Sequence, residues 1–228
     1  MPKIEKTTCG EDKNMVQYQL KEHYKFDDLV EIMARLRGED GCPWDREQTH
    51  ESIRQNMLEE AYEVCEAIDT GDRAALCEEL GDVLLQVVFH ARIEQEAGGF
   101  NIDDVADGIC KKLILRHPHI FGDVQVNDSA EVLVNWDNIK KAEKNQKTTT
   151  DTLTGVARSL PGLMRAEKLI KKAKKAGFPT EYTDEENVIG TKLFEIVREA
   201  QELGVDPERA LELANDAFIE QIKSKEKV

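Results

Sequence analysis

The sequence predicts an all-α protein, and three observations support this fold class. Apolar residues recur at helical spacing through most of the 228 residues. Short breaks that contain glycine, proline or a capping residue separate these runs. Two of the runs are joined by a very short turn, which is typical of antiparallel neighbours in a helical bundle. The hydrophobic content of 40% is enough for a core of this kind.

The first expected helix covers residues 26–37. Its apolar residues recur every three or four positions: Leu29, Ile32, Met33 and Leu36. Before it, residues 1–25 are polar and mixed in charge, and we expect a flexible N-terminal segment. After it, Gly38 to Asp45 contains two glycines and a proline and is expected to form a loop, with Trp44 packed at the end of the bundle.

The next two helices are expected from Thr49 to Asp69 and from Asp72 to Ala97. Thr70 and Gly71 separate them, and Asp72 is a suitable N-cap. Such a short connection makes the two helices antiparallel neighbours. Residues on one helix can therefore face residues on the other along the whole hairpin.

Further helices are expected from Ile102 to Arg116, before Pro118, and from Ser129 to Lys144, with Ser129 as the cap. Residues 147–158 form a predicted linker, because the composition shifts to Lys, Thr and Gln near its start. Residues 159–228 then form a helical C-terminal region. Its first helix, 163–176, is strongly basic and is expected to expose a solvated face.

Two acidic motifs on the predicted hairpin carry the strongest chemical signal. Residues three apart on a helix lie on one side, so Glu60 can act with Glu63, and Glu79 can act with Asp82. Two facing pairs of carboxylates would form a cation site. Mg²⁺ prefers oxygen ligands and is commonly bound by carboxylates together with substrate phosphates. The alternative is that these acids are solvated residues on ordinary exposed faces.

The position of the acids relative to the apolar residues favours the cation site. The first helix of the hairpin has an apolar stripe: Leu58, Ala61, Tyr62, Cys65 and Ile68. A different side carries Asn56, Glu60, Glu63 and Ala67. In the second helix, Glu79 and Asp82 border the apolar arc, which is formed by Leu76, Leu80, Val83, Leu84, Val87, Val88 and Ala91. Crowded carboxylates beside a packed face need a cation, or else a raised pKa.

The chain resembles the MazG family of nucleoside triphosphate pyrophosphohydrolases, whose signature is EExxE followed by ExxD on the next helix. Both motifs are present, at residues 59–63 and 79–82. Further matching segments lie at residues 41–45, 81–89, 116–121, 136–140 and 159–166, within a resemblance that extends from about Phe26 to Phe178. It implies an all-α catalytic domain over residues 26–146 and a homodimer in which paired hairpins form a four-helix core.

The resemblance also implies an activity: hydrolysis of nucleoside triphosphates, ribose or deoxyribose, between the α and β phosphorus, which yields the monophosphate and pyrophosphate. The cofactor would be Mg²⁺, with Mn²⁺ as the alternative, and the role would be control or sanitising of nucleotide pools. The expected metal ligands are Glu60, Glu63, Glu79 and Asp82. Glu59 and Glu63 are the expected catalytic residues, with Glu59 orienting or deprotonating the attacking water.

Basic and aromatic residues supply the expected substrate contacts. By resemblance, Lys112 and Arg116 would hold the triphosphate and Trp136 would lie beside the base or sugar, with Lys140 among the neighbouring cations. The alternative is that these residues are surface cations and a core tryptophan.

Larger members of the family carry two copies of the domain, and residues 159–228 resemble a degenerate second copy. When Gly190 is aligned with Gly81, Thr191 stands in place of Asp82 and Val188 in place of Glu79. No EExxE motif precedes them. This region is therefore expected to be structural or dimer-forming, without a metal site of its own.

Charge and composition exclude some partners. A net charge of −15 argues against a nucleic-acid polymer, since that binding depends on Lys and Arg. No apolar run reaches membrane-spanning length, no start resembles a signal peptide, and the five cysteines suit reduced thiols, so we expect a cytoplasmic protein without membrane contact. Cys65 and Cys77 are expected in the core.

Two alternative functions stay open at this point. One is a non-catalytic helical dimeric scaffold that keeps its acids for a structural cation or a basic partner. The other is a narrower pyrophosphatase directed at dUTP or dCTP. Base preference depends on the shape of a pocket that the acidic motifs do not specify.

Overall fold

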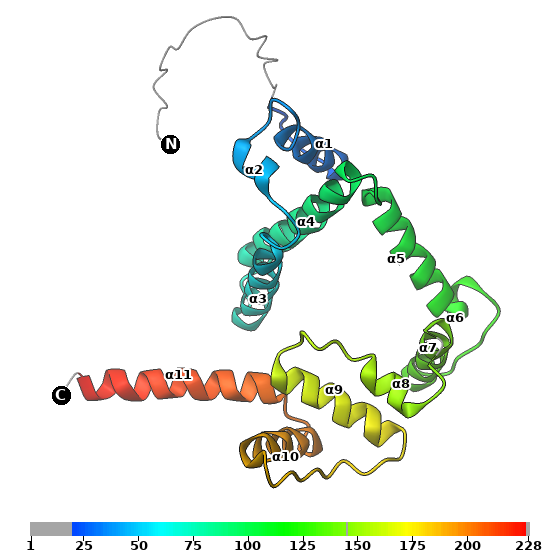
Figure 1. Cartoon of the computed structure of the whole chain (residues 1–228), viewed down its shortest axis with the longest axis vertical. Helices are drawn as coiled ribbons and strands as arrows, with labels where there is room; N and C mark the ends of the chain where they lie inside the picture. The colour runs from blue at the N-terminus through cyan, green and yellow to red at the C-terminus, as the bar shows by residue number, and fades with distance from the viewer. Residues whose placement is uncertain (1–19, 145, 227–228) are drawn as a thin grey trace, which may run out of the picture. The chain divides into compact units, whose positions relative to one another are not determined.

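The computed structural model describes residues 20–144 and 146–226 (Figure 1). Most of the predicted flexible N-terminal segment falls on residues 1–19, outside this range. The described residues contain eleven helices and no strand, which confirms the all-α prediction. None of these helices combines the length and apolar character needed to cross a membrane. The chain divides into two compact units, residues 1–111 and 112–228.

The first unit is built on a helical hairpin with one further helix packed against it. Its elements are α1 (Phe26–Leu36), α2 (Pro43–Glu47), α3 (Arg54–Thr70), α4 (Arg73–Glu96) and most of α5 (Ile102–Arg116). The core consists of Met33, Ile53, Val88 and Phe89, each at most 4% exposed. Flanking apolar side chains pack around it, so α1 is held against the C-terminal half of α4.

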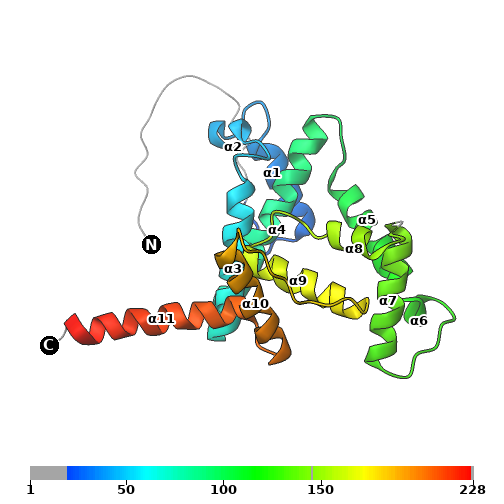
Figure 2. The ribbon, with the colours of Figure 1, turned by 60° about the horizontal axis from the view of Figure 1, so that its bottom comes forward.

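The α3–α4 hairpin has the turn that the sequence predicts. Gly71 adopts a left-handed conformation with φ of 69°, which a side chain would disfavour, and ends α3. Asp72 then caps α4, since its Oδ1 accepts hydrogen bonds from Ala74 N at 2.9 Å and Ala75 N at 3.1 Å. As a result the two helices run antiparallel and side by side (Figure 2).

Arg37 ties the end of α1 to the end of α4. Its side chain is only 6% exposed and pairs with Glu96, with Nη2 to Oε2 at 2.8 Å. The same guanidinium donates to the Gln48 carbonyl at 3.1 Å and lies 5.3 Å from the centroid of the Phe89 ring. These contacts fix the segment that leads from α1 into the hairpin.

The second unit is arranged around α9. Its elements are α6 (Pro118–Phe121), α7 (Ser129–Glu143), α8 (Thr149–Thr154), α9 (Gly162–Lys175), α10 (Val188–Glu202) and α11 (Pro207–Glu226). Helix α9 contacts α8, α10 and α11, and α10 also contacts α11. Ile170 of α9 and Val197 of α10 are at most 2% exposed, and they form the buried side of this packing.

Helices α10 and α11 repeat local features of α4 and α5. When Gly190 is aligned with Gly81, the fully buried Val197 corresponds to the buried Val88. Helix α10 is followed by Gly204 with φ of 70°, as α4 is followed by Gly98 with φ of 79°. The next helix is then capped by an Asx side chain. Asn101 Oδ1 accepts from two backbone N–H groups in the first turn of α5, and Asp206 Oδ1 accepts from two in the first turn of α11.

Several local expectations were wrong. The predicted loop at residues 38–45 gives way to α2 at Pro43, because proline suits the first helical position. The N-cap of α7 is Asp128, whose Oδ1 accepts from Glu131 N at 2.9 Å, and Ser129 is the first helical residue. Helix α8 lies inside the predicted linker, where Thr148 and Asp151 form a capping box.

Some residues expected to be packed are exposed. Trp44 is 58% exposed and does not pack at the end of the bundle in this chain. Cys65 and Cys77 are exposed free thiols, not core residues. Both lie on the helices of the hairpin, whose outer faces are not covered within one chain.

Candidate functional site

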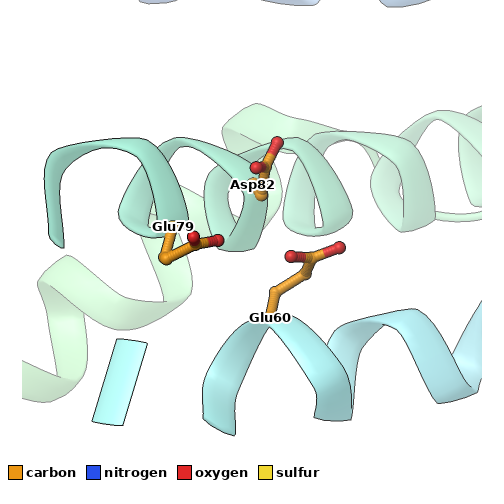
Figure 3. A group of neighbouring side chains, drawn as sticks. All are labelled: Glu60, Glu79 and Asp82. Atoms are coloured by element: carbon orange, nitrogen blue, oxygen red, sulfur yellow. The ribbon is translucent and has the colours of Figure 1, made fainter. Parts of the chain in front are cut away.

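Three carboxylates converge between the two helices of the hairpin. Glu60 comes from α3, and Glu79 and Asp82 come from α4 (Figure 3). One oxygen from each lies within 4.8 Å of the others, and all three side chains are partly buried. Within residues 20–144 and 146–226, this is the only group of three or more His, Cys, Asp or Glu side chains close enough to share an ion.

The sequence builds this group through helical spacing and the short turn. Glu79 and Asp82 share one side of α4 because they are three residues apart. Glu60 lies on the side of α3 that also carries Ala67, which is 4% exposed. The small Ala67 side chain allows α3 to approach α4 closely, so the acids of the two helices face each other.

Burial and like charges act together on the cluster. The pKa of Glu60 is raised, first by burial and then by the negative charges of Asp82 and Glu63. The pKa of Glu79 is raised in the same way, first by burial and then by Glu63 and Glu78. Hard oxygen donors that crowd together in this way fit a divalent cation, which would relieve their repulsion.

Glu63 and Glu59 lie at the edge of the cluster. Glu63 is exposed and raises the pKa of both Glu60 and Glu79, so it is near both carboxyls. Glu59 is also exposed, adds to the charge on Glu60, and accepts a long hydrogen bond from Gln55 Nε2 at 3.5 Å. The structure thus brings three of the four expected metal ligands into one close group, with Glu63 and Glu59 at its edge.

Two of the expected substrate residues contact each other in the second unit. The Arg116 guanidinium lies 5.9 Å from the centroid of the Trp136 ring, and the His117 ring packs edge-on against the same indole at 4.9 Å. Arg116 Nη2 also pairs with Glu143 at 2.6 Å. Its charge therefore already has a partner.

Lys140 and Lys112 differ in their surroundings. Lys140 lies one helical turn after Trp136 on α7 and is partly buried in a basic pocket. Lys112 is exposed on α5. All four expected substrate residues belong to the second unit, whereas the acidic cluster belongs to the first.

Sequence reasoning missed a histidine cluster in the first unit. His50 Nδ1 lies 2.8 Å from His90 Nδ1, and His50 Nε2 lies 2.9 Å from Glu94 Oε1. The two imidazole rings stack with centroids 5.1 Å apart. His50 precedes α3 and its partners are on α4, so no local spacing in the sequence could have paired them.

Comparison with known proteins gives a consistent result. Residues 48–121 match the MazG nucleotide pyrophosphohydrolase domain, a segment that contains the hairpin and all of its acids. The chain is 40% identical to the nucleoside triphosphate pyrophosphohydrolase of Escherichia coli (strain K12), over 90% of this chain and 88% of that protein.

Two further relatives agree. The Thermotoga maritima nucleoside triphosphate pyrophosphohydrolase/pyrophosphatase MazG is 39% identical, over 89% of this chain and 86% of its own length. The Bacillus subtilis protein YabN, described as uncharacterized, is 43% identical over 86% of this chain, which spans only 45% of YabN. With the matched domain, the acidic hairpin and these relatives together, the chain belongs to the MazG family of nucleotide pyrophosphohydrolases.

Proposed function

We propose that this protein hydrolyses nucleoside triphosphates to the monophosphate and pyrophosphate in a reaction that depends on Mg²⁺, with Mn²⁺ as the alternative cofactor. The observation that carries the proposal is the convergence of Glu60, Glu79 and Asp82 on the hairpin, within the part of the chain that matches the family. The names of the Escherichia coli and Thermotoga maritima relatives support the same reaction.

Glu60, Glu63, Glu79 and Asp82 would hold the cation. When bound, a divalent cation neutralises charge on the phosphate oxygens and on the transition state. The four carboxylates would supply oxygen ligands to the cation, and Glu63 is exposed, so a phosphate could approach from its side. Burial and then their mutual repulsion raise the pKa of Glu60 and Glu79, and a bound cation would relieve the repulsion.

Glu59 and Glu63 are the residues that we assign to catalysis. Water attacks the α phosphorus, the bond from that phosphorus to the bridging oxygen breaks, and pyrophosphate leaves. Glu59 is next to the ligands without belonging to the close group, and it is exposed. It is therefore suited to orient the water and accept its proton.

Lys112, Arg116, Trp136 and Lys140 are the proposed substrate residues. Arg116 and Trp136 already form a cation–aromatic pair, which suits a phosphate next to a base or sugar. Arg116 would share its charge between Glu143 and the substrate. Lys112 and Lys140 supply further positive charge on α5 and α7.

We also infer that the protein forms a homodimer through the hairpin. The apolar stripe of α3 is exposed in one chain, with Leu58 at 42%, Tyr62 at 53% and Ile68 at 59%. On α4, Leu80 is 52% and Leu84 is 39% exposed. A second hairpin packed on these residues would complete a four-helix core. Such an arrangement explains why α3 has both an acidic side and an apolar side.

The C-terminal region fits a degenerate second copy of the domain, in addition to the catalytic domain at residues 26–146. The repeated features of α10 and α11 support this assignment. Thr191, which aligns with Asp82, uses its hydroxyl locally: it accepts from Asp184 N at 3.0 Å and donates to the Asp184 carbonyl at 3.3 Å. We therefore assign metal binding to the first copy alone.

Product analysis tests the proposal. The purified protein is incubated with each common NTP and dNTP and Mg²⁺, beside Asp82→Ala as a control. Monophosphate and pyrophosphate from the parent protein, lost in the variant, would support the reaction, and the rates would report whether dUTP or dCTP is preferred. A folded protein that turns over none of these nucleotides would instead favour a dimeric scaffold.

A further inference from the structure

A concave basic pocket in the second unit lies outside the acidic cluster. It has a volume of about 170 Å³ and is formed by residues of α7, the segment before α8, α8 itself and α9. Its charged lining residues are Asp137, Lys140, Lys141, Lys147, Lys172 and Lys175. Five cations and one carboxylate thus face a common space in a chain whose net charge is −15.

The single carboxylate does not neutralise these cations. Asp137 forms an ion pair with Lys175, so this lysine compensates the negative charge of Asp137. Burial opposes ionisation of Asp137, but the Lys175 contact and the charges of Lys141 and Lys140 outweigh burial and lower its pKa. Five lysines therefore share a single carboxylate inside the pocket.

Lys172 is the centre of the remaining positive charge. It is partly buried, and its pKa is lowered first by burial and then by Lys140, with Lys144 and Lys141 adding to the effect against the attraction of Asp137. Like charges held this close destabilise one another unless an anion lies between them. These lysines come from α7 and α9, which the ion pair of Lys175 with Asp137 joins, so the folded chain holds the like charges together.

We propose that this pocket binds a small, multiply charged phosphate compound without the help of a metal ion. Phosphate oxygens accept several charge-assisted hydrogen bonds at once, which suits lysines that converge from different directions. The volume exceeds the share of a single water molecule, about 30 Å³, several-fold. Pyrophosphate and the triphosphate chain of a nucleotide both present several charged phosphate oxygens, and the experiment distinguishes between these two ligands.

The inference goes beyond the proposed hydrolysis, because it requires neither a divalent cation nor turnover. Lys140 is the one residue common to the pocket and the proposed substrate contacts. The test therefore uses other lysines and excludes metal. Failure of the hydrolysis proposal would leave binding in the absence of metal unaffected, and failure of the pocket would leave hydrolysis to be judged by its own product analysis.

Helix α9 provides a matched pair of variants. Lys172→Gln with Lys175→Gln removes two cations that line the pocket and leaves Asp137 without its partner. Lys171→Gln with Lys174→Gln removes the same charge from the same helix at exposed positions outside the pocket lining. Thermal unfolding of both variants checks that they are folded.

The experiment is calorimetric titration of the full-length protein with pyrophosphate in EDTA. We expect binding to the parent protein and to the Lys171/Lys174 variant, and binding at least about tenfold weaker in the Lys172/Lys175 variant, since hydrogen bonds to charged groups are among the stronger ones. Asp137→Asn should bind pyrophosphate more tightly than the parent. If the Lys172/Lys175 variant does not fold, Lys147→Gln alone should show the loss.

Other outcomes would overturn the proposal. Equal weakening in both double variants would mean that pyrophosphate responds only to overall charge. No heat of binding to the parent protein would mean that the pocket takes no such anion. A single-stranded oligonucleotide that binds more tightly than pyrophosphate would identify the surface as a nucleic-acid site. Titration with ATP in EDTA separates pyrophosphate from a nucleotide as the ligand. If ATP and pyrophosphate bind equally tightly, the pocket recognises only the phosphates. If ATP binds more tightly, the pocket also contacts the nucleoside, and either result supports the site.

Discussion

Glu60 on α3 and Asp82 on α4 hold carboxylate oxygens within 4.8 Å of each other across the hairpin. The Asp82 charge is the second cause of the raised pKa of Glu60, after burial. The two residues are far apart in the sequence, and the short turn at Gly71 brings them together. A contact between two acids is unfavourable unless a cation or a proton compensates their charges.

Mg²⁺ or Mn²⁺ should raise the midpoint of thermal unfolding of the parent protein. At a cation concentration about 100-fold above the dissociation constant, linkage gives about 2.7 kcal/mol of stabilisation. Glu60→Gln should remove this effect, whereas Glu66→Gln, exposed on the same helix and outside the cluster, should keep it. Unchanged cation stabilisation in Glu60→Gln would exclude the cluster as the cation site.

Glu59→Gln should lower kcat by about 100-fold or more, in the range typical of a general base. Its cation stabilisation should stay close to that of the parent protein, because Glu59 is not one of the four proposed cation ligands. Glu63→Gln should impair both properties. Steady-state kinetics combined with thermal unfolding separates these roles, and a Glu59→Gln variant with normal kcat would remove Glu59 from the mechanism.

His90 predicts a pH dependence of stability. Burial, followed by the neighbouring His50, lowers the pKa of His90 below its ordinary value of 6.5. The unfolded chain therefore binds this proton more tightly than the folded one. The contribution of His90 to stability is complete above pH 6.5 and is lost as the pH falls to the lowered native pKa.

Denaturant unfolding at a series of pH values measures this contribution. The slope from His90 cannot exceed about 1.4 kcal/mol per pH unit, the value for one proton. His90→Gln should reduce the slope between pH 5 and pH 7, and His23→Gln, at an exposed position, should not.

Asp72→Ala should reduce the free energy of unfolding by about 1 kcal/mol, the usual cost of a lost N-cap. In the parent protein two backbone N–H groups of α4 donate to this carboxylate, and in the variant they lose their acceptor. Arg73→Ala, one residue later and exposed, should change stability by less than about 0.5 kcal/mol. Urea titrations followed by circular dichroism compare the two, and equal losses would contradict the capping role.

Leu84→Lys should convert the inferred dimer to a monomer, because a charge in a packed helical interface is strongly unfavourable. Leu84 is 39% exposed on the outer face of α4 in one chain. Leu133→Lys on α7, where the side chain is 64% exposed, is the control and should leave the assembly unchanged. Analytical ultracentrifugation measures the mass, and a parent protein that sediments as a monomer would refute the dimer.

Much of the hairpin could be predicted from local sequence. Asp72 is the predicted cap, Gly71 is the predicted break, and the helix from Ile102 to Arg116 has the expected ends. These features depend on residues close together in the chain, whose propensities act locally. The prediction of Ser129 as the cap of α7 was wrong because Asp128, directly before it, suits this position equally well. Only the hydrogen bond that Asp128 accepts from Glu131 N distinguishes the two residues.

Other features depend on contacts that periodicity does not encode. The stripe that contains Tyr62 and Cys65 was correctly identified as apolar, but its exposure follows from the other side of α3 packing on α4. The pairing of His50 with His90 requires the full hairpin and the segment before it. The lysines of α9 are predicted on a solvated face, but Lys172 lines a pocket together with residues of α7 and α8.

The turn at Gly71 and Asp72 also fixes the rotation of α4 relative to α3, and with it the direction in which the acids of α4 point. Each residue of an α-helix turns the side chains by roughly 100°, so one residue inserted or deleted here would rotate Glu79 and Asp82 away from Glu60 while leaving every acid in place. The length of this connection is thus as much a part of the cation site as its ligands. A designer who transplants the hairpin should copy the turn residue for residue.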